Sequence, residues 1–266
     1  MIDRFGREID YLRISVTDRC NLRCRYCMPL SGAKLFSHED ILSFEEITEV
    51  VKAFVDRGGR KIKLTGGEPL VRRGILKLVE MLAGIKGIKD LSMTTNGVLL
   101  AKFAKSLYEA GLHRVNVSLD TMDAEKFSLI TQGGEINDVF LGVEEAQKAG
   151  LVPLKINCIV EYSSAEKDAQ AVKAFADARG LKVQFIRLMN LTSGDFAIVE
   201  NGSGGDCLCC NRLRLLSDGT VRPCLFSDIG FNVRTLGAED ALRLAVQNKP
   251  REGTKTKDKW MYRLGG

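Results

Sequence analysis

Apolar residues recur along the first two thirds of the chain in two alternating patterns, one typical of buried strands and one of amphipathic helices. Short apolar runs predict six strands, at residues 11–17, 61–65, 91–95, 114–119, 153–160 and 182–189. Helical spacing predicts helices between them, at residues 43–57, 75–82, 101–110, 137–149 and 165–179. This alternation predicts parallel strands joined by right-handed crossovers. Because no dinucleotide fingerprint follows the first strand, we expect an α/β fold with a partial (βα)6 TIM-like barrel rather than a Rossmann sheet.

The last quarter of the chain has a different character. Residues 190–205 are rich in Gly, Ser and Asn and predict a loop. Asp218-Gly219 then separates two short apolar runs, at 213–216 and 221–225, which predicts a β-hairpin. We therefore expect two regions, a barrel at residues 1–190 and a small C-terminal extension at residues 191–266.

Composition narrows the class of protein. The chain has 266 residues, enough for one barrel-sized domain, and no run of about twenty apolar residues or N-terminal leader, so we expect a cytoplasmic protein without a membrane span. The net charge of +5 is spread along the sequence, which suits an anionic small molecule better than a nucleic-acid groove. Eight cysteines in a reducing compartment favour metal binding over disulfides.

The N-terminal cysteines have a chemically informative spacing. Cys20, Cys24 and Cys27 form C-x3-C-x2-C directly after the first predicted strand. Three thiolates can hold a cubane iron–sulfur cluster and leave one iron open to a small molecule, whereas a structural zinc needs four protein ligands. A zinc site with a distant fourth ligand, or cysteines that only pack, are the competing interpretations.

A second group of cysteines flanks the predicted hairpin. Cys207, Cys210 and Cys224 form C-x2-C-x13-C, again three thiolates, while Cys209 could replace a neighbour or add a fourth ligand. A zinc ribbon is the alternative. Cys158 stands apart from both groups and is expected in the core.

Further candidate residues lie where strands meet loops. Gly66, Gly67 and Glu68 follow the second strand in a Gly-Gly-Glu-Pro turn, in which two glycines let the backbone approach a ligand closely. Three more predicted strands have polar ends, which contain Thr94, Ser118 and Lys155. We expect all three residues at the carboxyl ends of their strands, where barrel active sites open. For any one of them, a capped loop start is an equally good interpretation.

Together, the cysteine loop and the Gly-Gly-Glu-Pro turn resemble the radical S-adenosylmethionine (SAM) superfamily. Over nearly its whole length the chain is similar to the GTP 3',8-cyclase family, which performs the first step of molybdenum cofactor biosynthesis. The most specific similarities are Cys210-Asn-Arg-Leu-Arg214, Arg222-Pro-Cys-Leu-Phe226 and the terminal Gly265-Gly266. The resemblance implies two [4Fe-4S] clusters, one that cleaves SAM reductively and one that binds the guanine of GTP through its unique iron.

The resemblance also assigns residues to roles. It implies that Cys20, Cys24 and Cys27 hold the first cluster and Cys207, Cys210 and Cys224 the second. The residues implied to bind SAM are Tyr26, Gly66, Gly67, Glu68, Ser118 and Met189. Those implied to bind GTP are Arg13, Lys63, Thr94, Lys155, Arg212 and Arg214. Gly265 and Gly266 are implied to enter the active site and to be needed for activity.

Two arginines allow a physical check of this assignment. Arg212 and Arg214 alternate on a predicted strand, so both face one side, where two guanidinium groups could grip a triphosphate bidentately. A solvated strand face is the alternative. Two departures from the family stand out: Gln184 and Arg187 occupy positions where the family has Arg and Glu, and the link from residue 189 to 207 is several tens of residues shorter.

The sequence therefore predicts an enzyme that converts GTP to (8S)-3',8-cyclo-7,8-dihydroguanosine 5'-triphosphate. An electron donor protein is expected as a partner, nucleic acid and membranes are not, and a homodimer is left open. One alternative is a related radical SAM enzyme with an auxiliary cluster that acts on a peptide or another nucleotide. The other is a non-catalytic metal-binding or redox-sensing module.

Overall fold

The computed structural model describes residues 1–29 and 32–265, whose strands form one open sheet of nine in the order β6-β5-β4-β3-β2-β1-β7-β8-β9. The strands are β1 (Tyr11–Ser15), β2 (Lys61–Thr65), β3 (Asp90–Thr95), β4 (Arg114–Ser118), β5 (Lys155–Val160), β6 (Lys182–Arg187), β7 (Arg212–Leu215), β8 (Thr220–Arg222) and β9 (Phe231–Asn232). The strands from β1 to β6 are parallel. The predicted partial barrel is therefore confirmed.

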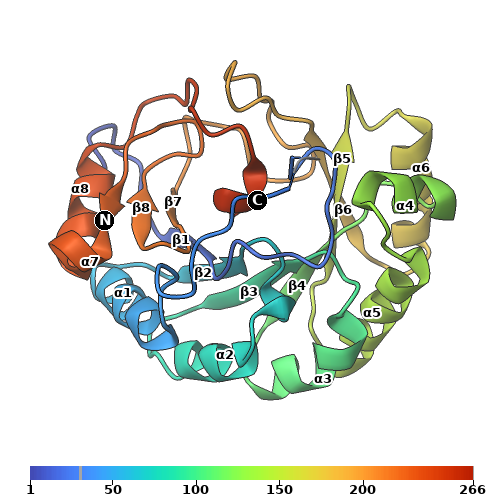
Figure 1. The fold of residues 1–266 in the computed structure, drawn as a ribbon, viewed down its shortest axis with the longest axis horizontal. Coiled ribbons are helices and arrows are strands. Elements are labelled where there is room, and N and C mark those ends of the chain that lie inside the picture. Colours follow the sequence, from blue (N-terminus) through green and yellow to red (C-terminus); the bar gives the residue numbers. More distant parts are fainter. Residues whose placement is uncertain (30–31, 266) are drawn as a thin grey trace.

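The helices cover the convex side of this curved sheet (Figure 1). They are α1 (Phe44–Asp56), α2 (Ile75–Ala83), α3 (Leu100–Glu109), α4 (Ala124–Thr131), α5 (Ile136–Ala149), α6 (Lys167–Asp177), α7 (Val233–Leu236) and α8 (Ala238–Gln247), with 3-10 turns η1 (Pro69–Val71) and η2 (Met261–Arg263). The capping box before α1 is present, since the Ser43 hydroxyl accepts from the Glu46 N–H at 3.1 Å and the Glu46 carboxylate accepts from the Ser43 N–H at 2.7 Å. The sequence prediction missed α4, α7 and α8. None of the helices in the described part of the chain is both long and apolar enough to span a membrane.

Each barrel strand presents an apolar face to the helices and a polar face to the interior. In β1, Leu12 and Ile14 are fully buried toward the helices, whereas Arg13 alternates with them and faces inward. In β2, Ile62 and Leu64 do the same around Lys63. A barrel interior filled only by protein is packed with layers of branched apolar side chains. The polar inner face therefore indicates an interior that accommodates a polar ligand.

The predicted hairpin extends the sheet. β7 lies parallel to β1, with Tyr11 opposite Arg212 and Ile14 opposite Leu215. β8 then returns antiparallel to β7, and β9 pairs with β8. The hairpin is thus confirmed, and β1 is the shared strand between the barrel and the C-terminal residues.

The short link before β7 connects two strands that are not neighbours in the sheet. Glu200 forms an isolated antiparallel bridge with Phe185 of β6, and the Gln184 amide donates to the Asn201 carbonyl at 3.3 Å. A few residues on, the Arg212 guanidinium of β7 donates to the hydroxyl of Ser203 at 3.1 Å. The link therefore spans from β6 to β7 on the open side of the barrel.

Candidate functional site

The first cysteine loop leaves the carboxyl end of β1. The Cys27 N–H donates to the Cys24 carbonyl at 2.9 Å, which folds the loop back on itself. The Cys20 sulfur accepts from the Leu22 N–H at 3.4 Å and from the Asn96 amide at 3.8 Å. Such N–H groups stabilise cluster-bound sulfur and tune its potential.

The electrostatics of this loop also fit an iron–sulfur cluster. Burial, helped by the charges of the neighbouring Cys20 and Asp120, raises the pKa of the Cys24 thiol to about 12. Burial and the other two cysteines likewise raise the pKa of Cys27. Three clustered thiols of this kind ionise together only beside a strongly cationic group. Among residues 1–29 and 32–265, no three Cys, His, Asp or Glu side chains are arranged to hold a metal ion. A cubane differs because each thiolate binds a separate iron atom.

A small cavity of about 30 Å³ adjoins the loop and contains two predicted SAM contacts, Tyr26 and Ser118. The Tyr26 hydroxyl donates to one oxygen of Asp120 at 2.7 Å, and the Ile159 N–H donates to the other at 2.8 Å. Burial raises the pKa of Asp120. Asp120 therefore fixes the ring of Tyr26, although the sequence analysis did not select it. Its place two residues after Ser118, just past β4, was the available signal.

The Gly-Gly-Glu-Pro turn packs against the backbone that leads into the cysteine loop. The Gly67 N–H donates to the Thr17 carbonyl at 2.7 Å and the Glu68 N–H to the Arg19 carbonyl at 2.8 Å. A Cβ on Gly66 would lie 2.5 Å from the Thr17 carbonyl oxygen, and one on Gly67 would lie 2.2 Å from that of Arg19. Both positions therefore require glycine.

Glu68 joins this turn to the end of β3. Its carboxylate accepts from the Leu70 N–H at 3.1 Å, the Thr95 hydroxyl at 2.8 Å and the Asn96 N–H at 2.7 Å. Burial raises the pKa of Glu68 to about 7, although these hydrogen bonds oppose the rise. Glu68 thus holds its own turn against the loop that follows β3. Its direct contact with SAM stays a prediction.

Three cations, the buried Lys63 and the half-buried Arg13 and Arg214, converge on the inner face of β1, β2 and β7. Arg13 lies opposite Lys63 on one side and opposite Arg214 on the other. Burial, helped by the charges of Arg13 and Arg114, lowers the pKa of Lys63 to about 6. Burial also lowers the pKa of Arg214 to about 9, again with help from Arg13. Cations that repel one another in a low-dielectric interior favour binding of a polyanion.

Two further predicted GTP contacts border this group. The Thr94 hydroxyl is buried and has no hydrogen-bond partner in the described residues, so it could donate to a ligand. Lys155 corrects the sequence analysis, because it opens β5 instead of ending it. The stagger of neighbouring strands nevertheless places Lys155 beside Asn116 in the middle of β4, and its charge helps to lower the pKa of Lys63.

The C-terminal tail lies inside the barrel as far as Gly265. Figure 1 shows the red C-terminal segment on the concave side of the sheet, near the middle of the molecule. The carbonyls of Leu264 and Gly265 accept from Arg214 and Arg13, each at 3.4 Å. Gly265 has φ of +73°, and a Cβ there would lie 2.8 Å from the Thr65 hydroxyl. The predicted entry of Gly265 thus matches its position, while Gly266 lies outside the described residues.

A small apolar cluster anchors this tail. Its buried members come from the link, the hairpin and the tail itself: Leu191, Leu216, Leu225, Phe226 and Leu264. Met189, a predicted SAM contact, is half-buried against it. The cluster therefore connects the tail to the segment that follows β6.

The second cysteine group lies at the amino end of β7, whereas the first group lies beyond the carboxyl end of the neighbouring β1. Cys210 lies two residues before β7 and Cys224 two residues after β8, so both lie at the end where β7 begins. Burial raises the pKa of Cys210, but Lys249 and Arg212 lower it more, and its pKa falls below the usual range. Cys209 is exposed and donates to Asp206 at 3.0 Å. We therefore keep Cys207, Cys210 and Cys224 as the predicted ligands.

The register between β1 and β7 sets the separation of the two cysteine groups. The first group follows the carboxyl end of β1, and the second precedes the amino end of the parallel β7. Five residues of strand lie between these ends, which corresponds to about 17 Å. Arg13, Lys63 and Arg214 occupy this interval. Cys158, in contrast, is fully buried in the main core, as predicted.

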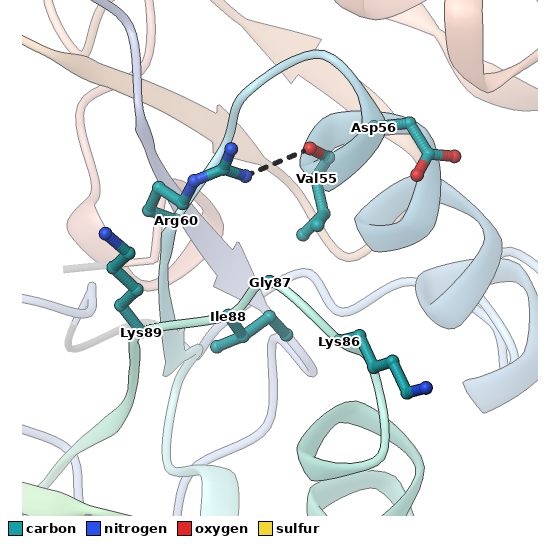
Figure 2. A pocket seen from close by; sticks show the side chains of 7 residues that line it. All are labelled: Val55, Asp56, Arg60, Lys86, Gly87, Ile88 and Lys89. Atoms are coloured by element: carbon teal, nitrogen blue, oxygen red, sulfur yellow. Dashed lines mark hydrogen bonds between the residues drawn. The ribbon is translucent and has the colours of Figure 1, made fainter.

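Another hollow, of about 730 Å³, opens at the amino ends of β2 and β3 (Figure 2). Arg60 in its wall donates to the Val55 carbonyl at 3.3 Å, and Lys86 and Lys89 extend in opposite directions. Its cations do not converge on one point, and it contains none of the predicted site residues. We therefore place the functional site in the barrel interior and not in this larger hollow.

Comparison with known proteins agrees with this placement. Residues 14–176 match the family model described as the radical SAM superfamily. The GTP 3',8-cyclase of Thermodesulfovibrio yellowstonii is 43% identical, over 89% of this chain and 88% of the relative. That of Peptoclostridium acidaminophilum is 36% identical, over 100% of this chain and 98% of the relative. Its alignment spans 324 positions against the 266 residues of this chain, so the relative has several tens of additional residues.

A solved structure supports the fold assignment. The structure titled native anSMEcpe with bound AdoMet has a TM-score of 0.67 at 20% identity, over 96% of this chain and 88% of the other. The fold and the sequence relatives agree with the cysteine and glycine motifs described above. This chain therefore belongs to the radical SAM superfamily and, within it, to the GTP 3',8-cyclase family.

Proposed function

We propose that this protein converts GTP to (8S)-3',8-cyclo-7,8-dihydroguanosine 5'-triphosphate in molybdenum cofactor biosynthesis, with SAM as cosubstrate. The observation that carries the proposal is the group of three cations, Arg13, Lys63 and Arg214, on the inner face of β1, β2 and β7, between the two cysteine groups. A nucleoside triphosphate supplies the negative charge that this interior requires. The two relatives described above are named GTP 3',8-cyclase, which agrees with that substrate.

Residues of the chain bind and orient the reactants. Arg13, Lys63 and Arg214 neutralise the triphosphate, and Arg212, oriented by Ser203, approaches it from the amino end of β7. The Thr94 hydroxyl, which has no hydrogen-bond partner among the described residues, would donate to the nucleotide.

The cofactors would be held at the two ends of this interior. Cys20, Cys24 and Cys27 would hold one [4Fe-4S] cluster, and Cys207, Cys210 and Cys224 the other. When bound, the first cluster and SAM supply the 5'-deoxyadenosyl radical chemistry of the superfamily. Tyr26, positioned by Asp120, and the Gly66-Gly67 backbone would hold SAM beside that cluster.

The tail completes the site. Leu264 is buried in its own apolar cluster, and the Gly265 carbonyl lies against Arg13. At the carboxyl ends of β1 and β2, this arrangement would exclude water from the interior. A radical formed there must be protected from side reactions. Gly265 and Gly266 would therefore affect product formation more than SAM binding.

Three features of the cellular context complete the proposal. Reductive cleavage of SAM needs one electron per turnover, so a small electron donor protein is expected as a partner. Eight cysteines, none in a disulfide, suit a cytoplasmic location. A homodimer is the assembly we would test first by light scattering, because twofold dimers are the commonest oligomers.

Anaerobic reconstitution with iron and sulfide, followed by product analysis, tests the proposal. We expect 5'-deoxyadenosine formation that depends on GTP, together with the cyclised nucleotide. Cys210→Ser should abolish the nucleotide product, whereas Cys209→Ser, at an exposed neighbouring cysteine, should retain it. SAM cleavage that does not respond to GTP would instead indicate a relative acting on a peptide or another nucleotide. No 5'-deoxyadenosine under reductant would indicate a non-catalytic module.

A further inference from the structure

Lys249, two residues after α8, is a buried lysine with no role in the function described so far. Only 1% of it is exposed to solvent. Its ammonium donates to the carbonyls of Arg212 and Pro223, each at 2.7 Å, and lies within hydrogen-bonding reach of the Cys210 thiol. A lysine is rarely buried this completely unless its charge and its donors are all used.

The two carbonyl acceptors flank the predicted cluster ligands. Arg212 lies two residues after Cys210, and Pro223 directly precedes Cys224. One ammonium therefore joins the first residue of β7 to the residue after β8, next to the two cysteines that lie just outside these strands. Without it, two buried carbonyls would lose their partner, and the spacing of the two sulfurs would depend on the hairpin alone.

The residues after Lys249 reach the third cysteine through Arg7. The Arg7 guanidinium donates to the carbonyls of Pro250 at 2.6 Å, Arg251 at 3.0 Å and Cys207 at 2.7 Å. Its own charge is balanced by Asp3, at 2.7 Å. Residues 249–251 are thus connected to all three cysteine segments. Of the two cations involved, Arg7 and Lys249, it is Lys249 that faces the thiols.

We propose that Lys249 is a positioning residue for the second cluster, which holds Cys210 and Cys224 in place and raises the reduction potential of that cluster. The proposal rests on the proposed function, which supplies the second cluster. A cluster held by three thiolates gains a negative charge on one-electron reduction. A fixed positive charge a few ångströms away in a buried site stabilises that reduced form.

Three variants test the proposal in the full-length, anaerobically reconstituted protein. Lys249→Gln keeps a hydrogen-bond donor but removes the charge, and Lys249→Met removes both. Lys105→Met, at an exposed lysine of α3, is the control. The readouts are iron and sulfide per chain, and the midpoint potential of each cluster from a dithionite titration monitored by electron paramagnetic resonance.

We expect Lys249→Gln to retain about eight irons per chain, as in two cubanes, and to lower the potential of the second cluster by 59 mV or more, which is a tenfold change in its reduction equilibrium. The first cluster should not shift. Lys249→Met should lose iron from the second site as well, and Lys105→Met should match the wild type. If Lys249→Met does not fold, Lys249→Gln still decides the question.

Two results would overturn the proposal, and they differ in meaning. A wild-type protein that binds about four irons would contradict the proposed function itself and leave Lys249 no second cluster to position. About eight irons in the wild type, with both Lys249 variants unchanged in iron content and potential, would refute only the role of Lys249.

Discussion

Lys63 allows triphosphate binding to be measured as proton uptake. Burial, helped by the charges of Arg13 and Arg114, lowers the pKa of its ammonium to about 6. At pH 7 the side chain is therefore neutral in about nine of ten molecules without ligand. A triphosphate beside Lys63 would restore the charge, so GTP binding should take up close to one proton. Protonating this group at pH 7 costs about 1.4 kcal/mol, or tenfold in affinity.

The sign of the pH dependence follows from the lowered pKa. Below pH 6, Lys63 is already charged and contributes no pH dependence. Above pH 6, each further pH unit should weaken GTP binding by up to about tenfold, because binding takes up a proton and the proton concentration falls tenfold per pH unit. Replacing Lys63 by Met removes this dependence along with one of the cations.

Anaerobic calorimetry in buffers of different ionisation enthalpy measures the proton uptake directly. Lys63→Met is compared with the wild type, so the protons of GTP itself cancel in the difference. Lys61→Met is the matched control, since Lys61 lies on the same strand face but is paired with Asp10 at 2.8 Å. Equal proton uptake in the wild type and in Lys63→Met at pH 7 would refute the assignment of Lys63 to the triphosphate.

The remaining predictions concern the tail, the SAM side of the site and the scaffold. Gly265→Val should abolish the cyclised product, because the new side chain would clash with Thr65. The affinity for SAM, measured by titration, should stay within a few-fold of the wild type. Loss of SAM binding as well would contradict this prediction. Tyr26→Phe leaves one oxygen of buried Asp120 without its 2.7 Å donor and should lower stability by about 1–3 kcal/mol and weaken SAM binding. Ser43→Ala removes the cap of α1 and should cost about 1 kcal/mol in chemical denaturation, with kcat unchanged.

The barrel could be predicted from the sequence because each element carries a local signal. The apolar alternation of β2 and the capping box at Ser43 fix their elements within a residue or two. The same signal was available for α8, where Ala241, Leu242 and Ala245 recur at helical spacing and are fully buried. The sequence of α8 therefore contains a helix signal, although the prediction did not include this helix.

Other parts of the site have no local signal. Lys249 lies in a polar stretch that resembles an exposed loop, and its acceptors are 37 and 26 residues away. Lys155 was expected at the carboxyl end of its strand, although it lies near the amino end of the predicted strand 153–160. What the sequence does not show is that Lys155 lies level with the middle of β4, because that level depends on the stagger between strands. That stagger is a property of the whole sheet, so the spacing within one strand does not reveal it.

The direction of β7 decides whether two clusters can act on one substrate. If β7 ran antiparallel to β1, the chain would leave β1 and enter β7 at the same end, and Cys20 and Cys210 would crowd together. The parallel pairing of Tyr11 with Arg212 and Ile14 with Leu215 separates them by the length of a strand instead. This pairing depends on β1 and on the hairpin, not on the short link after Met189. The shortened link therefore alters the wall on the open side of the barrel but leaves unchanged the spacing that the proposed reaction requires.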